Sequence, residues 1–102
     1  RLIMNLTKRQ PIRSEAYKAA AKGESCAICD RKDGTVVFVH LDEAWAGKGF
    51  GQKSDDVAGF DGCMKCHNAY ANHHVTIEDW EITRAMYRTL LRRILKGIVI
   101  IK

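Results

Sequence analysis

The sequence has no apolar stretch of the length that crosses a membrane, and its only proline is Pro11. A transmembrane helix needs about 20 consecutive and mostly apolar residues, and the 102 residues contain no such run. The first residues also lack the apolar core of a secretory signal peptide. We therefore expect a cytoplasmic protein, in a reducing compartment, that does not bind a membrane.

Two common functional motifs are also missing. The P-loop pattern G-x-x-x-x-G-K-[ST] does not occur, although glycines recur at 47, 49 and 51. The β-α-β pattern that surrounds a thioredoxin-like C-x-x-C pair is missing as well. These absences argue against nucleoside triphosphate binding and against dithiol exchange. We also find no internal repeat beyond two C-x-x-C pairs and no low-complexity segment.

Acidic residues are missing from residue 83 onward, and this absence is part of an uneven distribution of charge. Residues 83–102 carry six Lys or Arg and no acid, and residues 1–22 carry six against one acid. Residues 23–82 carry eleven Asp or Glu against five bases, while the whole chain has a net charge of +5. Two basic flanks around an acidic centre fit a protein that holds phosphates at its edges and a cation in its middle.

Four cysteines form two C-x-x-C pairs, at Cys26 and Cys29 and at Cys63 and Cys66. Two such pairs separated by one loop are typical of a closed tetrahedral site with four thiolate ligands. A structural zinc ion is the interpretation that we favour, because a domain of this size gains much of its stability from a metal. Two disulfides or a rubredoxin-like iron site are the alternatives.

The second pair continues into His67, so that Cys63, Cys66 and His67 also match the C-x-x-C-H motif of covalent haem attachment. Covalent haem would require an exported chain, and it would leave Cys26 and Cys29 without a role. A c-type haem protein is therefore the weakest of the interpretations.

The order of residues predicts a single α+β domain with three helices and two short strands. Five of the eight glycines lie in residues 42–62, which we expect to form a long loop. Ser14 should cap the first helix and Gly23 should end it. We expect helices over 15–22, 64–71 and 77–96, and strands over 35–41 and near 57–60.

The last predicted helix is amphipathic. A capping box at 76–79 should begin it, Gly97 should end it, and residues 98–101 should form a short strand or an apolar tail. One face carries arginines four residues apart, which form either a solvated surface or a phosphate-binding surface: Arg84, Arg88 and Arg92. Another face should be buried: Ile82, Met86 or Tyr87, Leu90, Leu91, Ile94 and Leu95.

The expected elements follow one another in a recognisable order: a strand ending in His40, a glycine-rich loop, a second strand, and a helix opening with Cys63-x-x-Cys66-His67. This pattern resembles the HNH (ββα-metal) endonucleases. With Arg13-Ser14 and Lys53-x-x-Asp56 it is similar to phage and prophage nucleases of the YbcO-like and Ref-like type, over about residues 13–72.

The resemblance implies a zinc-stabilised, treble-clef-like domain that hydrolyses DNA in a bacterial or phage-infected cell. A basic arm and short helix (1–22) would precede the four-cysteine site and ββα core (23–74), and a helix and apolar tail (75–102) would follow. The implied site comprises His40 as general base, His67 as ligand of a catalytic Mg or Mn ion, Asp56 as orienting residue or ligand, and Lys48 and Lys53 as phosphate contacts.

Three positions depart from the family pattern. Val39 stands where many members have Asp or His before the general base, and Asp56 stands in place of the asparagine. Ala71 stands where many members have another metal ligand, for which Asn72, His73 or His74 could substitute. The alternative is a non-catalytic zinc module that binds nucleic acid or a protein, and the apolar tail leaves a dimer open.

Overall fold

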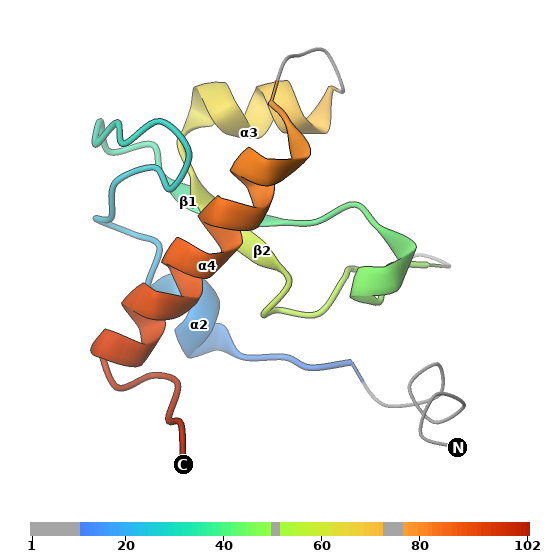
Figure 1. Cartoon of the computed structure of the whole chain (residues 1–102), viewed down its shortest axis with the longest axis vertical. Coiled ribbons are helices and arrows are strands. Elements are labelled where there is room, and N and C mark those ends of the chain that lie inside the picture. The colour runs from blue at the N-terminus through green and yellow to red at the C-terminus, as the bar shows by residue number, and fades with distance from the viewer. Residues whose placement is uncertain (1–10, 50–51, 73–76) are drawn as a thin grey trace.

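The structure is a computed structural model that describes residues 11–49, 52–72 and 77–102. It is a small α+β domain with a two-stranded sheet and helices, as the sequence predicts. In chain order the elements are α2 (Glu15–Ala19), β1 (Val37–His40), η1 (Ala44–Ala46), β2 (Gly59–Gly62), α3 (Met64–Ala71) and α4 (Asp79–Leu95), shown in Figure 1. Most of the expected basic arm (residues 1–10) and residues 73–76, which include His73 and His74, lie outside the described residues.

Strands β1 and β2 form an antiparallel hairpin in which Val37 pairs with Gly62 and His40 pairs with Gly59. The second strand begins two residues later than the sequence suggests, because the chain turns between Asp55 and Ala58, whose amide donates to the Asp55 carbonyl. Gly59 is required by packing. A β-carbon there would overlap the Val39 carbonyl and the ring of Phe38.

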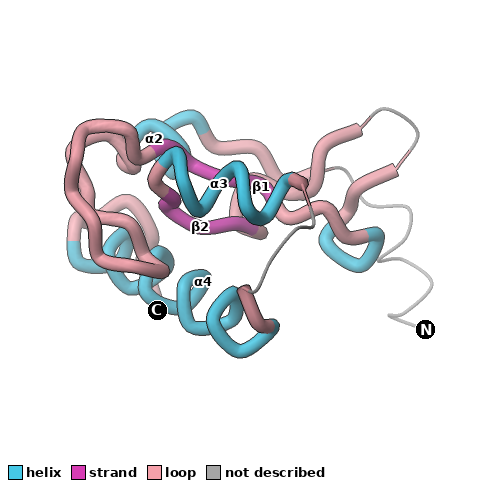
Figure 2. The backbone as a smooth tube through the Cα atoms, turned by 90° about the horizontal axis from the view of Figure 1, so that it is seen from above, coloured by secondary structure: helices cyan, strands magenta, loops and turns pink. Residues whose placement is uncertain are grey.

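Each helix contacts one part of the hairpin: α2 lies against β1, and α3 and α4 lie against β2. In Figure 1, α4 crosses in front of the hairpin and α3 lies above it. Figure 2 shows α3 over the strands and α4 at an edge of the molecule. The predicted bounds of α3 are confirmed, and α2 is three residues shorter than expected. Ser14 caps α2 by accepting from the Tyr17 amide.

The buried face predicted for α4 is correct in part, because Ile82 and Met86 pack against the core, and it is wrong for the leucines of the C-terminal half. The helix buries Ala85, Thr89 and Arg93 instead, while Ile82 and Met86 are only partly buried. The side chains predicted to be buried at the C-terminal half point away from the hairpin: Leu90, Leu91 and Leu95 are exposed. The physical reason lies in β2, whose buried Asp61 needs polar partners, which Thr89 and Arg93 of α4 supply.

Helix α4 begins two residues later than predicted. Its cap is Glu78, and the capping box joins Glu78 to Glu81, each side chain accepting from the other's backbone. Thr76, the expected cap, lies outside the described residues. Gly97 ends the helix with a φ of +76°, as predicted. The following residues form no strand in this part of the chain, since the amides of Ile98 and Val99 bond to the Arg93 carbonyl.

The core of the domain surrounds the hairpin and the cysteines. Phe60, Leu41 and Val39 are almost fully buried and lie in one cluster with Cys26 and Cys63. In the described part of the chain, no helix combines the length and the apolar character that a membrane crossing needs. The core is small, so the polar and metal-binding groups around it have a large share in holding the domain together.

Candidate functional site

The four predicted cysteine ligands come together. The Sγ atoms of Cys26, Cys29, Cys63 and Cys66 all lie within 4.8 Å of one another, and all four cysteines are free. The Sγ atoms of Cys29 and Cys63 are 3.7 Å apart. A tetrahedral zinc ion with Zn–S bonds of about 2.3 Å requires S–S separations of about 3.8 Å. The site therefore fits a zinc ion, and it does not contain the two disulfides that were the alternative.

The first pair of cysteines lies on a tight turn. The Asp30 amide donates to the Cys26 carbonyl at 2.9 Å, and the Cys26 amide donates to the Arg31 carbonyl at 2.7 Å. Asp30 adopts a left-handed conformation with φ of 66°, which aspartate tolerates better than most residues. The Ile28 amide points at the Cys26 sulfur at 3.4 Å. This turn presents both sulfurs on one side.

The second pair opens helix α3. Cys63 is the N-cap residue, and its carbonyl accepts from the His67 amide at 2.8 Å. The Met64 amide donates to the Thr35 hydroxyl at 3.0 Å, which ties the helix start to the segment before β1. The first turn of α3 thus carries Cys66 to the cluster, and His67, the next residue, lies at the same end of the helix.

The thiols of the cluster cannot all ionise by themselves. Burial disfavours the charged form of Cys26, but amide hydrogen bonds from the two C-x-x-C segments lower its pKa to about 7. Burial and the neighbouring Cys26 sulfur raise the pKa of Cys66 instead. A cation between the four sulfurs would stabilise the thiolate form of all of them.

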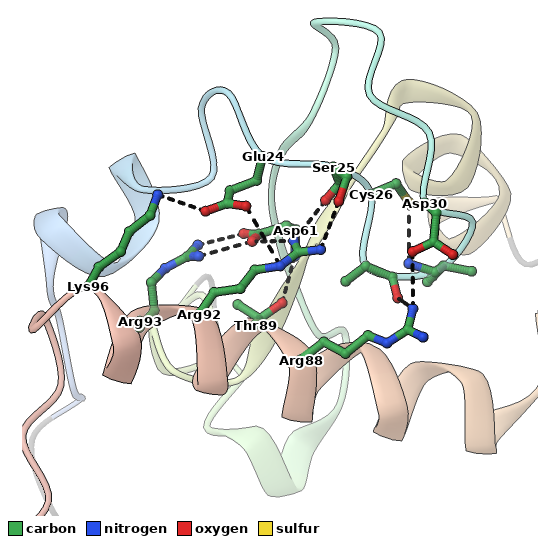
Figure 3. Close-up of polar contacts among 12 residues, drawn as sticks. Glu24, Ser25, Cys26, Asp30, Asp61, Arg88, Thr89, Arg92, Arg93 and Lys96 are labelled. Carbon is green, nitrogen blue, oxygen red and sulfur yellow. Dashed lines mark hydrogen bonds and ion pairs between the residues drawn. The ribbon is translucent and has the colours of Figure 1, made fainter.

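The arginines spaced along α4 contact the first cysteine pair, as Figure 3 shows in part. Arg88 donates to the Ala27 carbonyl at 3.0 Å, and Arg92 donates to the Ser25 carbonyl at 2.7 Å. Arg84 approaches the carbonyl of Ile28 at 3.4 Å. This arginine face is therefore neither a solvated surface nor a free phosphate-binding surface, because it fastens α4 to the metal-binding turn.

Asp61 in β2 is the other anchor of α4 (Figure 3). Arg93 is fully buried and forms a two-pronged ion pair with the Asp61 carboxylate, and Arg92 adds a hydrogen bond at 3.0 Å. The Arg93 Nε also donates to the Tyr17 carbonyl at 2.7 Å, so α2 is tied to the same group. The Asp61 amide donates to the Thr89 hydroxyl. These contacts stabilise the fold and do not point to chemistry.

His40 and Asp56 form a second polar site, at the end of β1. The His40 Nε2 atom lies 2.7 Å from the Asp56 Oδ1 atom. Asp56 is 2% exposed, whereas the His40 side chain retains 19% exposure. The rings of Phe38 and His40 pack edge to face, with their centroids 5.1 Å apart, and the Phe38 ring also lies close to Gly59. The imidazole is therefore held in one orientation with part of it open to solvent.

The surroundings of Asp56 favour its charged form. Burial opposes ionisation, but the hydrogen bond with His40, the Ser14 amide at 2.8 Å and the charge of Lys18 together lower the pKa of Asp56. Arg13 adds a cation 3.7 Å from Oδ1. Since Oδ1 faces His40 and Oδ2 accepts from Ser14, both oxygens are already engaged. Asp56 thus orients His40, and both of its oxygens also have a cationic side chain within 4 Å, Arg13 at Oδ1 and Lys18 at Oδ2.

His67, the other predicted site residue, does not join this pair. No hydrogen bond or ion pair joins it to His40 or Asp56 in the described part of the chain. Its Nδ1 atom is buried and has no hydrogen-bond partner among these residues. In the same part of the chain, the four cysteines are the one group of three or more Cys, His, Asp or Glu ligands. These residues therefore assemble no second site with three or more such ligands.

The two predicted phosphate contacts are on the surface. Lys48 forms an ion pair with Asp42 at 3.2 Å, and both side chains are about half exposed. Lys53 is exposed, and its carbonyl accepts from Arg13 at 3.0 Å. Neither lysine contacts His40 directly.

Two adjoining cavities of about 360 and 250 Å³ lie between α4, the end of α3 and the loop after β1. They share Glu43, Tyr70, Asp79 and Ile82. Their carboxylates would repel a phosphate, and His40, Asp56 and His67 do not line them. These cavities are therefore no part of a phosphodiester site.

Sequence reasoning missed the cations behind the histidine. Arg13 and Lys18 surround Asp56, although they are more than 35 residues away in the chain. The signal was weak, because arginine and lysine at the edge of a short helix usually face solvent.

Comparison of the chain with protein-family models, with curated proteins and with solved structures finds no match.

Proposed function

We propose that this chain is a metal-dependent DNA endonuclease of the HNH type, with His40 as general base. The observation that carries the proposal is the 2.7 Å contact between His40 and the buried Asp56 at the end of β1. The order of elements supports it, because a hairpin followed by a helix that starts at a cysteine cluster matches the pattern that the sequence shares with ββα-metal nucleases.

The contact with Asp56 determines which nitrogen of His40 could accept a proton. An ionised carboxylate can only accept hydrogen bonds, so the Nε2 atom of His40 must carry a hydrogen. In the neutral imidazole the other ring nitrogen, Nδ1, then has the free lone pair. Asp56 would in this way hold His40 in the tautomer that a base requires, and its negative charge would stabilise the imidazolium form.

The proposed reaction is hydrolysis of one phosphodiester bond. The Nδ1 atom of His40 takes a proton from water, and the water oxygen bonds to phosphorus. The bond between phosphorus and the 3′ oxygen breaks, and that oxygen then takes a proton from solvent. The products are a 5′ phosphate and a 3′ hydroxyl. Lys48 and Lys53 would contact phosphates on either side of the bond that breaks.

A divalent cation, Mg or Mn, would neutralise charge on the phosphate and on the leaving oxygen. We propose His67 as its ligand in this chain, because the buried Nδ1 atom of His67 lacks a partner among the described residues. Asp56 is not proposed as a ligand, since its oxygens already accept hydrogen bonds from the protein. The structural zinc in the cysteine cluster has no part in the reaction.

The test is a plasmid-nicking assay with Mg or Mn, using zinc-loaded protein and the variants His40→Ala and Asp56→Asn. We expect His40→Ala to lower the rate by about 10²-fold or more, because a positioned base contributes about 10²–10⁴-fold. Asp56→Asn should also lower it, since an amide does not fix the tautomer. Asp33→Asn, in the exposed turn before β1, is the matched control and should cut like the wild type.

If the plasmid stays equally intact with the wild type and with His40→Ala, whichever metal is added, the proposal is contradicted. The chain would then be a non-catalytic zinc module, whose DNA binding should weaken with salt and survive the loss of His40. Elemental analysis tests the haem interpretation, because a colourless protein with one zinc ion per chain cannot be a haem protein.

A further inference from the structure

The outer face of α4 is an exposed and mostly apolar stripe, on which the guanidinium of Arg84 also lies, 5.0 Å from the centre of the Trp80 ring. Trp80, Tyr87, Leu91 and Leu95 are separated by seven, four and four residues, a spacing that places them on one side of a helix. Their exposed fractions are 57%, 63%, 39% and 78%. This side is opposite to the one that packs on β2, and in Figure 2 α4 lies at an edge of the molecule.

The stripe is larger than scattered surface residues would explain. A fully covered aromatic side chain contributes about 150–250 Å² of contact area, and two aromatics and two leucines lie here in sequence along about four helical turns. The stripe therefore offers an apolar area of several hundred Å², on the order of the patches that mark interaction sites on monomers. A second copy of the same face would roughly supply what a standard interface of about 800 Å² per partner needs, with the flanking residues included.

The charge of α4 determines which pairing suits this stripe. All acids of the helix and its cap lie in the first turn, at Glu78, Asp79 and Glu81, and from residue 84 onward all charged residues are basic. In a parallel pair, three carboxylates would meet three carboxylates, and the helix dipoles would add to the repulsion. In an antiparallel pair, each acidic end lies beside the C-terminal end of the other helix. The cations there are already paired with Asp61 and Glu24, so it is the separation of the acidic ends and the opposed helix dipoles that favour this arrangement.

We propose that two copies of this chain associate through the outer faces of their α4 helices, packed antiparallel about a twofold axis. The occupant of the stripe is thus a second copy of the chain. The axis passes near Tyr87, because this residue lies midway between Trp80 and Leu95 along the stripe. Trp80 of one copy then lies near Leu95 of the other. This proposal does not depend on the nuclease proposal, since the stripe contains no residue of the histidine site.

Symmetric cross-linking tests both the contact and its direction. Three single variants, Tyr87→Cys, Trp80→Cys and Leu95→Cys, are exposed to mild oxidant in the zinc-loaded state, with the wild type as control for the native cysteines. We expect a cross-linked dimer from Tyr87→Cys alone. A mixture of the Trp80→Cys and Leu95→Cys proteins should also cross-link, although neither does so alone. Cross-linking by all three single variants would indicate a parallel pair and overturn the proposal.

Sedimentation equilibrium over a series of concentrations measures the association without added cysteines. Tyr87→Glu and Leu95→Glu place a charge on the stripe, and we expect each to raise the dimer dissociation constant by about tenfold or more. Ile101→Glu is the matched control, because Ile101 is 71% exposed but lies beyond the helix. Since all three positions are exposed, the monomer should fold, which zinc content confirms. A wild-type protein that is monomeric at every concentration would overturn the proposal.

Discussion

Asp56 and Asp61 lie five residues apart, both are almost completely buried, and their surroundings differ in kind. Asp61 is paired with Arg93, whose guanidinium is fully buried. Asp56 is paired with His40, whose ring is partly exposed. A buried carboxylate is thus a structural anchor at one position and part of a candidate reactive site at the other.

The difference lies in what each partner can still do. Arg93 uses its donors on Asp61 and on the Tyr17 carbonyl, and it has no acceptor. His40 uses only Nε2 on Asp56 and retains a second nitrogen. Asp61 is in contact with α4 and, through Arg93, with α2, whereas Asp56, in the loop before β2, is in contact with the start of α2 and the end of β1. Changes at the two positions should therefore have separable effects.

Removing the metal should have the largest effect, because it removes the frame on which both aspartates depend. Zinc binding in small domains contributes about 10–16 kcal/mol, which is comparable to the whole stability of a typical domain, about 5–15 kcal/mol. We expect a strong chelator to abolish the cooperative urea transition, as followed by circular dichroism. Added zinc should restore it. An unchanged transition in the chelated protein would show that the cysteine cluster does not hold the fold.

Asp61→Asn should have the next largest effect, since it leaves the charge of Arg93 buried without a counter-charge. Breaking a buried ion pair at one partner costs about 3–5 kcal/mol. We expect a loss of this size in the free energy of unfolding of the zinc-loaded protein, from urea denaturation.

Glu24→Gln is the matched control for Asp61→Asn. Glu24 also pairs with cations of α4, at 2.7 Å from Lys96, but nearer to the surface. Its removal should cost less than about 1 kcal/mol. Equal losses for the two variants would mean that burial of the Asp61 pair has no special weight.

The contribution of the Asp56 charge to stability should be visible in the pH dependence of unfolding, and we expect it to be the smallest of these effects. Its pKa is lowered in the folded protein against burial, by His40, the Ser14 amide and the charge of Lys18, with Arg13 also facing it. Its contribution is therefore fully present above the unfolded pKa of about 3.9 and is lost as the pH falls through the lower folded pKa.

Urea denaturation from pH 6 down to acid tests this expectation with Asp56→Asn. The variant should be less stable than the wild type at pH 6, and the gap should narrow as the pH falls below about 4. Glu43→Gln serves as a control for an exposed carboxylate. A gap that stays constant with pH would mean that the Asp56 charge makes no contribution.

The cysteine cluster and helix α3 could be predicted because local spacing determines them. A C-x-x-C pair places its sulfurs on one turn whatever surrounds it, and the residues from Met64 to Ala71 form a helix as expected. The face of α4 could not be predicted from periodicity. An arginine at position 93 normally faces solvent, and it is buried here because Asp61, 32 residues away, requires a partner.

The histidine site was predicted in part. The end of β1 at His40 follows from its β-branched and aromatic strand, and Asp56 was identified from the family pattern. Its role as an orienting group, and the closeness of Arg13 and Ser14, depend on how the first helix returns to the loop before β2. Such long-range contacts leave no periodic signal in a single sequence.

The cysteine cluster also has a consequence for the unfolded chain. The ligands at Cys29 and Cys63 are 34 residues apart, and His40 and Asp56 both lie between them. A metal that joins these sulfurs closes this loop, and closing a loop of this length with a covalent link lowers the entropy of the unfolded chain by an amount worth roughly 4 kcal/mol. In a chain that binds the metal before the hairpin forms, the segment with the candidate base is tethered at both ends, and this should speed the meeting of His40 with Asp56.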